Sequence, residues 1–287
     1  MKKLCGLLVM MVAACSSDPA TPPASDAGTD TGTPGVDVPV TPDAGGGTTP
    51  VEVRFRAMVG SMPFSCGMMY SGLGTTMSTW RPKDFRFYVH DVKLLTASGT
   101  EVPVTLSEEM TWQRDGVALL DFEDRAGDCV EGNPPTNTTV RGSAPAGTYT
   151  GLRFTLGVPF RMNHQNQATA MSPMNLSAMF WSWQSGYKFL KIDGATRGVT
   201  GFNIHLGSTG CDGNAMGSVT MCSAPNRATV TLMGFNPASS TVVADLARLI
   251  ANTNVDMSTG APGCMSSPTD PECTGIFANL GLPINGG

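Results

Sequence analysis

Three histidines occur in this chain of 287 residues, and two of them lie in segments that suit metal binding. A neutral imidazole is the commonest protein ligand for late first-row metals. His164 lies in a loop rich in Asn and Gln, whose side chains can fix the tautomer of an imidazole. His205 lies in a strand-like segment, on the face opposite its apolar neighbours. The pair predicts a soft-metal site; the alternative is that each histidine is an ordinary hydrogen-bonded residue.

Tryptophan and methionine side chains near these histidines add two kinds of candidate. Trp181 and Trp183 are two residues apart, so they share one face of an extended strand. Such a pair usually packs in a core or forms a binding ledge. Met162 lies close to His164, and its thioether is a soft ligand that favours Cu(I). Because most methionines fill cores and irregular gaps, Met162 is a weak candidate ligand.

Short segments of alternating apolar and polar residues must position these side chains. Such alternation, between turns rich in Gly and Pro, predicts strands and a β-sandwich-like fold. The expected strands cover residues 51–56, 85–95, 117–122, 147–158, 187–192, 200–206 and 228–233. Apolar residues at helical spacing predict a helix over 240–250, capped by Ser239 or Ser240, and a short one over 276–280. We therefore expect one all-β domain with long disulfide-stapled loops and one or two short helices.

The start of the chain reads as a lipoprotein signal peptide. Lys2 and Lys3 precede a short apolar run, and the small residues before Cys15 resemble a lipobox. The run is too short for a membrane-spanning helix. We expect residues 1–15 to be the signal, with Cys15 as the lipidated N-terminus of the mature protein. The alternative is an ordinary secretory signal with a chance cysteine.

The next segment, residues 16–50, is rich in Ser, Asp, Ala, Thr, Pro and Gly and has few large apolar side chains. Such a composition predicts a disordered tether, because it cannot bury enough surface to offset its chain entropy. Residues 51–287 then form the expected single domain. The lipid would hold this domain at the cell envelope, at the outer membrane, facing the periplasm or the cell surface.

Six cysteines remain after Cys5 and Cys15 are set aside. An even number in an exported domain indicates disulfides, and six cysteines allow about 15 connectivities. Short Gly-, Pro- and Ser-rich loops favour two of the pairs and leave a long-range third; the expected pairs are Cys211–Cys222, Cys264–Cys273 and Cys66–Cys129. A thiolate metal cluster is the competing interpretation, but the chain has no C-x-x-C pair.

Charge and motif patterns argue against several function classes. The formal net charge is −5, only 14% of residues are charged, and no basic stripe is present, so nucleic acid is not an expected partner. The chain has no H-E-x-x-H spacing for a metal hydrolase and no G-x-S-x-G nucleophile elbow. We therefore expect a binding protein and not an enzyme.

Several stretches resemble the metallo-mystery pair four-Cys motif proteins, an MbnP-like copper-binding family. The resemblance covers nearly all of residues 51–287. The stretches that carry it are 87–89 with 91–92, 118–123, 137–142, 151–160, 163–164, 178–181, 186–189, 205–211, 261–266 and 270–273.

The resemblance implies an exported β-sandwich protein that binds copper, with Cu(I) the expected state. It also implies a di-haem cytochrome c peroxidase-like (MbnH-like) partner that oxidises a tryptophan of the copper protein to kynurenine. His164 and His205 match the family's histidine motifs, and Trp181, ahead of Trp183, is the candidate for oxidation. His90 is a less certain ligand, because related proteins have Trp-x-His where this chain has Tyr88-Val89-His90.

Two functional hypotheses follow from the sequence. The first is an exported copper-binding lipoprotein in copper acquisition or handling, attached to the membrane only through its N-terminal lipid. The second is a surface-exposed β-sandwich module that binds carbohydrate or protein without metal, with Trp181 and Trp183 as a stacking platform. The second hypothesis assigns no role to His164.

Overall fold

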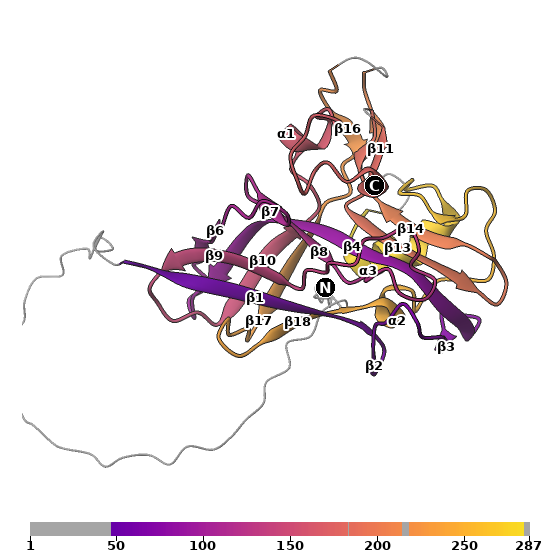
Figure 1. The fold of residues 1–287 in the computed structure, drawn as a ribbon, viewed down its shortest axis with the longest axis horizontal. Coiled ribbons are helices and arrows are strands. Elements are labelled where there is room, and N and C mark those ends of the chain that lie inside the picture. The colour runs from indigo at the N-terminus through magenta and orange to yellow at the C-terminus, as the bar shows by residue number, and fades with distance from the viewer. Residues whose placement is uncertain (1–46, 183, 214–217, 284–287) are drawn as a thin grey trace, which may run out of the picture.

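The computed structural model describes residues 47–182, 184–213 and 218–283. The expected signal peptide, the lipidated Cys15 and most of the expected tether lie outside the described residues. Two main β-sheets dominate the described part of the chain, as expected for an all-β sandwich-like fold (Figure 1). No helix among the described residues has the length and apolar character needed to cross a membrane.

The smaller main sheet is built around the first strand of the domain. It runs in the order β18-β1-β9-β6, with β2 paired to β1. Its strands are β1 (Thr48–Val59), β2 (Met62–Pro63), β6 (Thr105–Leu106), β9 (Thr139–Pro145) and β18 (Thr241–Asp245). β1 begins within the segment assigned to the tether, where Thr48 pairs with Pro145 of β9.

The larger sheet is built around the long strand β4. It runs in the order β17-β10-β4-β13-β14-β19, with four further strands paired at its sides. Its strands are β3 (Tyr70–Leu73), β4 (Ser78–Leu95), β5 (Glu101–Pro103), β7 (Gln113–Arg114), β8 (Val117–Asp121), β10 (Gly151–Leu156), β13 (Leu190–Thr196), β14 (Phe202–Leu206), β17 (Ala228–Met233) and β19 (Gly263–Cys264).

Aromatic side chains join the two sheets across the core. Phe55 of β1 packs edge-on against Phe87 of β4 and Phe154 of β10, with ring centroids 6.0 and 5.6 Å apart. All three rings are buried, and such edge-to-face pairs add to the stabilisation from the apolar area that they remove from water. The alternation along these strands therefore places its apolar face in one core between the sheets.

Two small hairpins and a short helix stand together beyond the larger sheet, at the top of Figure 1. The helix is α1 (Phe160–Asn163). The hairpins are β11 (Phe180–Ser182) with β12 (Gly186–Tyr187), and β15 (Thr209–Cys211) with β16 (Cys222–Ala224). The remaining helices are α2 (Leu246–Leu249), α3 (Thr274–Leu280) and the 3-10 turns Ser177–Met179 and Pro271–Cys273.

The prediction of a helix over 240–250 is wrong in its first half. Thr241–Asp245 forms β18, which pairs in parallel with β1, and only Leu246–Leu249 is helical. β-branched Val242 and Val243 suit a strand, and the pairing with β1 outweighs their helical spacing. The cap is Asp245, whose carboxylate accepts a hydrogen bond from the Ala247 amide, and not Ser239 or Ser240.

Two other expectations differ in detail. The strand expected over 187–192 is divided between β12 and β13, and the strand expected over 147–158 is shorter, since β10 covers Gly151–Leu156. The short C-terminal helix is confirmed as α3. Gly281 ends it with a φ of 68°, a left-handed conformation that glycine adopts without steric cost.

Candidate metal centre

His164 is the C-cap residue of α1, beside the β11–β12 hairpin. The preceding residue, Asn163, is buried, and its side-chain amide donates to His164 Nε2 at 3.2 Å. Asn163 Oδ1 accepts from the Tyr187 amide at 2.9 Å, which joins α1 to β12. A Cβ on Gly186 would lie 2.3 Å from the Asn163 carbonyl, so this close approach requires glycine. The Asn-rich loop therefore supplies a partner that orients the imidazole, as the sequence predicted.

A disulfide lies on the other side of the His164 ring. Cys222 Sγ is 3.6 Å from His164 Nε2, and Cys222 is bonded to Cys211. The ligand atoms of His164, Cys211 and Cys222 all lie within 4.8 Å of one another. We refer to Asn163, His164, Cys211 and Cys222 as the His164 corner. While the two sulfurs are bonded to each other they are not thiolates, which are the form of cysteine that binds metals.

His205 lies on β14, on the face opposite the core side chains of that strand, as expected. Its Nε2 donates to Asp193 Oδ1 on the neighbouring strand β13 at 2.7 Å. The residue is only 8% exposed. The Trp181 ring lies 6.0 Å from the His205 ring, centroid to centroid, and also packs on Gly207, where a Cβ would be 2.8 Å from it. The structure thus brings one candidate ligand next to one candidate for oxidation.

The other predicted site residues lie elsewhere. His90 Nδ1 donates to the Gly157 carbonyl at 2.9 Å, and burial lowers the pKa of His90, which favours its neutral form. Met162 is buried in the hydrophobic core, where it packs as an apolar residue. Trp183 lies outside the described residues. Among the described residues, the cluster of His and Cys ligand atoms around His164 includes neither His205 nor His90.

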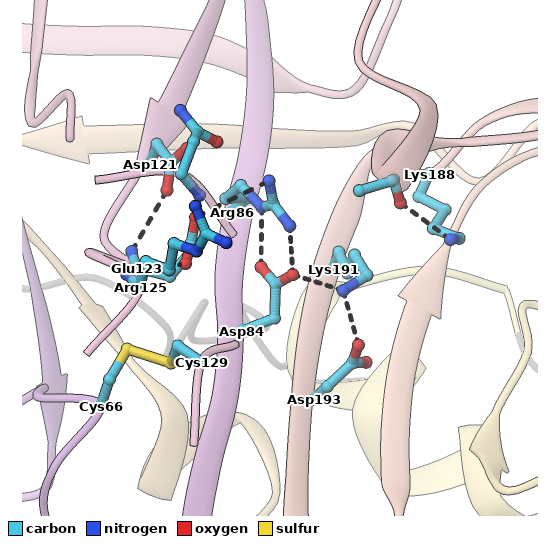
Figure 2. Close-up of polar contacts among 12 residues, drawn as sticks. Cys66, Asp84, Arg86, Asp121, Glu123, Arg125, Cys129, Lys188, Lys191 and Asp193 are labelled. Atoms are coloured by element: carbon cyan, nitrogen blue, oxygen red, sulfur yellow. Dashed lines mark hydrogen bonds and ion pairs between the residues drawn. A yellow bond between two sulfur atoms is a disulfide. The ribbon is translucent and has the colours of Figure 1, made fainter. Parts of the chain in front are cut away.

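Through Asp193, His205 joins a buried group of charged side chains that the sequence analysis did not anticipate. Figure 2 shows the other members of this group. Cross-strand register aligns Asp121, Arg86, Lys191 and His205 on four adjacent strands, β8, β4, β13 and β14. Asp84 and Asp193 form the next row of the same face. We call these six residues, together with Glu123, the charge ladder.

Opposite charges in the charge ladder meet between its two rows, either along one strand or diagonally across two strands. Arg86 and Lys191 both contact Asp84, and Arg86 Nε lies 2.8 Å from Asp84 Oδ1. Lys191 Nζ is also 2.6 Å from Asp193 Oδ2. Glu123 Oε1 lies 3.9 Å from the Arg86 guanidinium. Charges with so little water around them require this pairing, because an unpaired buried charge costs several kcal/mol, on the order of 3–5.

The pKa values follow the local balance of burial and partners. Burial alone would raise the pKa of Asp193, but the hydrogen bond from His205 and the charge of Lys191 lower it to about 2. Burial raises the pKa of Asp121 to about 8, against the opposing charge of Arg86. Within the described part of the chain, Asp121 Oδ2 has no hydrogen-bond partner. Burial therefore favours the neutral form of Asp121, whereas its partners favour the ionised form of Asp193.

The segment 122–136 covers this charged face of β4. The Cys66–Cys129 disulfide anchors the segment beside the ladder (Figure 2), and Cys129 Sγ lies 3.9 Å from the Pro82 carbonyl of β4. Amides of the same segment donate to the Glu123 carboxylate: Asn133 to Oε1 at 2.8 Å and Arg125 to Oε2 at 3.2 Å. A loop closed by the long-range disulfide thus buries a face that alternation alone would assign to solvent.

The three disulfides have the expected pairing, Cys66–Cys129, Cys211–Cys222 and Cys264–Cys273. Of the ladder residues, only His205 was singled out from the sequence. A usable signal was present, since Asp-x-Arg at 84–86 and Lys-x-Asp at 191–193 alternate with large apolar residues in a chain with few charges. Two charge pairs at strand spacing indicate that each pair lies on one face of its strand.

Comparisons with known proteins agree with this fold. A family model described as MbnP matches residues 48–266. Among solved structures, MbnP from Methylosinus trichosporium superposes with a TM-score of 0.72 and 33% sequence identity, over 83% of this chain and 94% of that one. No match to a curated protein sequence was found. With a family model that spans most of the domain and a similar structure at this identity, the chain belongs to the MbnP family.

Proposed function

We propose that this protein is an exported, lipid-anchored copper-binding protein that acts in copper acquisition or handling, and that it is not an enzyme. The observation that carries the proposal is the contact between His205, held by Asp193, and the ring of Trp181. A carboxylate that fixes a histidine tautomer is a common outer partner of a metal ligand. The MbnP family is linked to copper handling, which supports copper as the metal.

The residues present suit a copper ion. His205 uses Nε2 to bind Asp193, so Nδ1 is the nitrogen that this histidine would offer. His164 is oriented by Asn163. The β11–β12 hairpin contacts both segments, since Trp181 of β11 meets His205 and Tyr187 of β12 meets Asn163. Imidazole nitrogens are good ligands for copper, and a low-coordinate pair suits Cu(I).

We further propose that a di-haem cytochrome c peroxidase-like partner, with peroxide as the oxidant, converts Trp181 to kynurenine. Two oxygen atoms are added as the indole C2–C3 bond breaks, and hydrolysis then releases C2 as formate. Kynurenine carries a carbonyl oxygen and an aniline nitrogen, so it would add a donor beside His205. Trp181 is partly exposed and not sealed in the core, which leaves it open to an oxidising partner. The choice of Trp181 over Trp183 rests on the ring contact with His205.

The test measures bound copper and protein mass together. The protein is produced with and without the di-haem partner, loaded anaerobically with Cu(I) in the absence of disulfide reductants, and titrated against a chromophoric chelator. We expect copper to bind, with the intact mass showing conversion of tryptophan to kynurenine only after co-production. His164→Ala and His205→Ala should each weaken binding by at least about tenfold, the equivalent of about 1.4 kcal/mol.

His90→Gln is the matched control. Glutamine keeps a donor for the Gly157 carbonyl, and we expect this variant to bind copper like the parent. The proposal fails if copper stays unbound in both preparations, or if both alanine variants bind as well as the parent. A loss of copper in His90→Gln alone would move the site to His90.

A further inference from the structure

The Cys211–Cys222 disulfide differs from the other two in its accessibility. The four cysteines of the other disulfides are buried, each with no more than 2% of its surface exposed. Cys211 and Cys222 are both partly exposed, on the hairpin that stands beyond the larger sheet. Because thiol–disulfide exchange requires direct attack on a sulfur atom, a reductant in solution reaches this disulfide first.

The histidine beside this disulfide is positioned to complete a metal site. His164 Nε2 lies 3.6 Å from Cys222 Sγ, and all three ligand atoms lie within 4.8 Å. One imidazole and two thiolates form a ligand set used by thiophilic metals. Cys211 and Cys222 are also directly paired residues of β15 and β16, so their side chains project from neighbouring backbone positions.

Contacts other than the disulfide hold the hairpin in place. The Asp212 carboxylate accepts from the amides of Thr220 and Met221, at 2.7 and 2.9 Å. Gln184 Nε2 donates to the carbonyls of Cys211 and Gly213, which joins the hairpin to the β11–β12 turn. None of these bonds involves a sulfur atom, so we expect the two sulfurs to stay near His164 after reduction.

We propose that reduction of Cys211–Cys222 turns the His164 corner into a three-ligand site for a thiophilic metal ion. A dithiol, either a small molecule or a protein, donates two electrons and two protons to the disulfide and becomes a disulfide itself. The products in this chain are two thiols. Metal binding then releases both thiol protons and forms bonds to the two sulfurs and to His164 Nε2, where the metal replaces the hydrogen bond from the Asn163 amide.

Cu(I) is the metal that this site would take most readily from the copper pool that the protein is proposed to handle. Soft thiolates select Cu(I), and three ligands suffice for it. The inference goes beyond the proposed function, because it needs neither His205 nor an oxidised tryptophan. It adds redox control over the ligands available to His164.

The experiment uses the folded protein treated with dithiothreitol, which is then removed anaerobically by gel filtration. Alkylation followed by peptide mass spectrometry identifies the reduced cysteines, and circular dichroism checks the fold. Cu(I) is then titrated against bicinchoninate in the oxidised and the reduced protein. We expect alkylation at Cys211 and Cys222, and thiolate-to-copper absorption in the ultraviolet. The affinity for Cu(I) should rise by at least about tenfold, the equivalent of about 1.4 kcal/mol.

Three variants identify the ligands. The double variant Cys211→Ser with Cys222→Ser, treated in the same way, should show no gain on reduction. His164→Ala should lose most of the gain, whereas His205→Ala should keep it even where it abolishes binding to the oxidised protein. That last result separates this inference from the proposed function, because the oxidised protein reports only on the imidazole site.

Three outcomes would overturn the inference. One is equal Cu(I) affinity before and after reduction. Another is a gain that persists in the double serine variant. The third is loss of the fold, or labelling of the buried cysteines, at the dithiothreitol concentration that opens Cys211–Cys222.

Discussion

The charge ladder and the His164 corner both contain a candidate copper ligand, but they are built in different ways. The ladder is buried under a covering segment, and its carboxylates and cations neutralise one another across four strands. The His164 corner is partly exposed, and amide and sulfur groups lie against its imidazole. His205 is therefore held rigidly by charge, and His164 by a buried amide and a hairpin.

This difference separates the roles of the two candidate ligands. A ligand embedded in a neutralised charged network keeps its tautomer and position at low reorganisation cost. A ligand beside an accessible disulfide can change its neighbours when the disulfide opens. We expect substitutions in the ladder to act on the stability of the whole domain. Substitutions of His164, or of the side chains that tie down the neighbouring hairpin, should act on binding with small effects on stability.

The largest expected effect is that of Arg86→Met. Arg86 is 1% exposed and contacts Asp84 and Glu123. Its removal takes the cation from Glu123 and leaves Asp84 with Lys191 alone. Breaking one side of a buried ion network costs about 3–5 kcal/mol. Urea denaturation at neutral pH should show a loss of unfolding free energy of this size, with little change in the dependence of that free energy on urea concentration. A loss below about 1 kcal/mol, the size found for exposed ion pairs, would show that water reaches the ladder.

The next effect compares two disulfides by the length of chain that each closes. Cys66 and Cys129 are 63 residues apart, and Cys211 and Cys222 are 11 apart. Loop-closure entropy then predicts losses of about 4 and about 3 kcal/mol for the paired serine variants. Thermal unfolding of the two double variants measures the difference. The gap should exceed this prediction, because only the longer loop covers the ladder; an equal loss would contradict the covering role.

The third effect is a pH dependence from Asp121. Its pKa is about 8 in the folded protein, far above the ordinary value of about 3.9 that applies in the unfolded chain. Its contribution to stability is therefore full below about pH 4 and is lost as the pH rises toward 8, by at most about 1.4 kcal/mol for each step of one in pH. Asp121→Asn removes this loss, so the variant should gain about 1–3 kcal/mol on the parent between pH 5 and pH 8.

Chemical denaturation of both proteins at pH 5, 6.5 and 8 measures this gain. The control is Asp91→Asn, at an exposed position on the same strand as Arg86. The difference in stability between this variant and the parent should change little over this pH range. If the difference in unfolding free energy between Asp121→Asn and the parent does not change with pH, Asp121 is ionised in the folded protein over this whole range.

The smallest expected effect is that of Gln184→Ala at the His164 corner. Gln184 is exposed, and its amide bonds to Cys211 and Gly213 tie down the hairpin without burying charge. A typical hydrogen bond contributes about 0.5–1.5 kcal/mol, and an exposed one lies at the low end. We expect almost no change in the melting temperature and faster hydrogen exchange in 209–211 and 222–224. A loss of global stability comparable to that of Arg86→Met would remove the distinction between the two regions.

Much of the sheet framework could be predicted, because alternation reports which face of a strand is buried. Residues 228–233 coincide with β17, and the core residues of β14 are the ones expected. Local spacing failed at 240–250, where a parallel partner distant in the chain decides the structure. The disulfide pairs followed from loop lengths because two of the loops are short.

The candidate site was only partly predictable for the same physical reason. His164, His205 and Trp181 stood out as rare residue types, and the Asn-rich loop indicated how His164 is oriented. The ladder did not stand out, because charges alternating with apolar residues are typical of a solvent-facing strand. What buries them is the segment 122–136, held by a disulfide whose partner, Cys66, is distant in the chain.

The row of charges across β8, β4, β13 and β14 also limits how these strands can be misaligned during folding. Shifting β13 by one residue against β4 would turn Lys191 and Asp193 into the apolar layer between the sheets. A shift of two residues keeps the faces but can set Lys191 opposite Tyr88, which is fully buried, and remove its ammonium from Asp84. Both errors leave a charge unpaired, so the register that aligns Arg86 with Lys191 is selected against its nearest competitors.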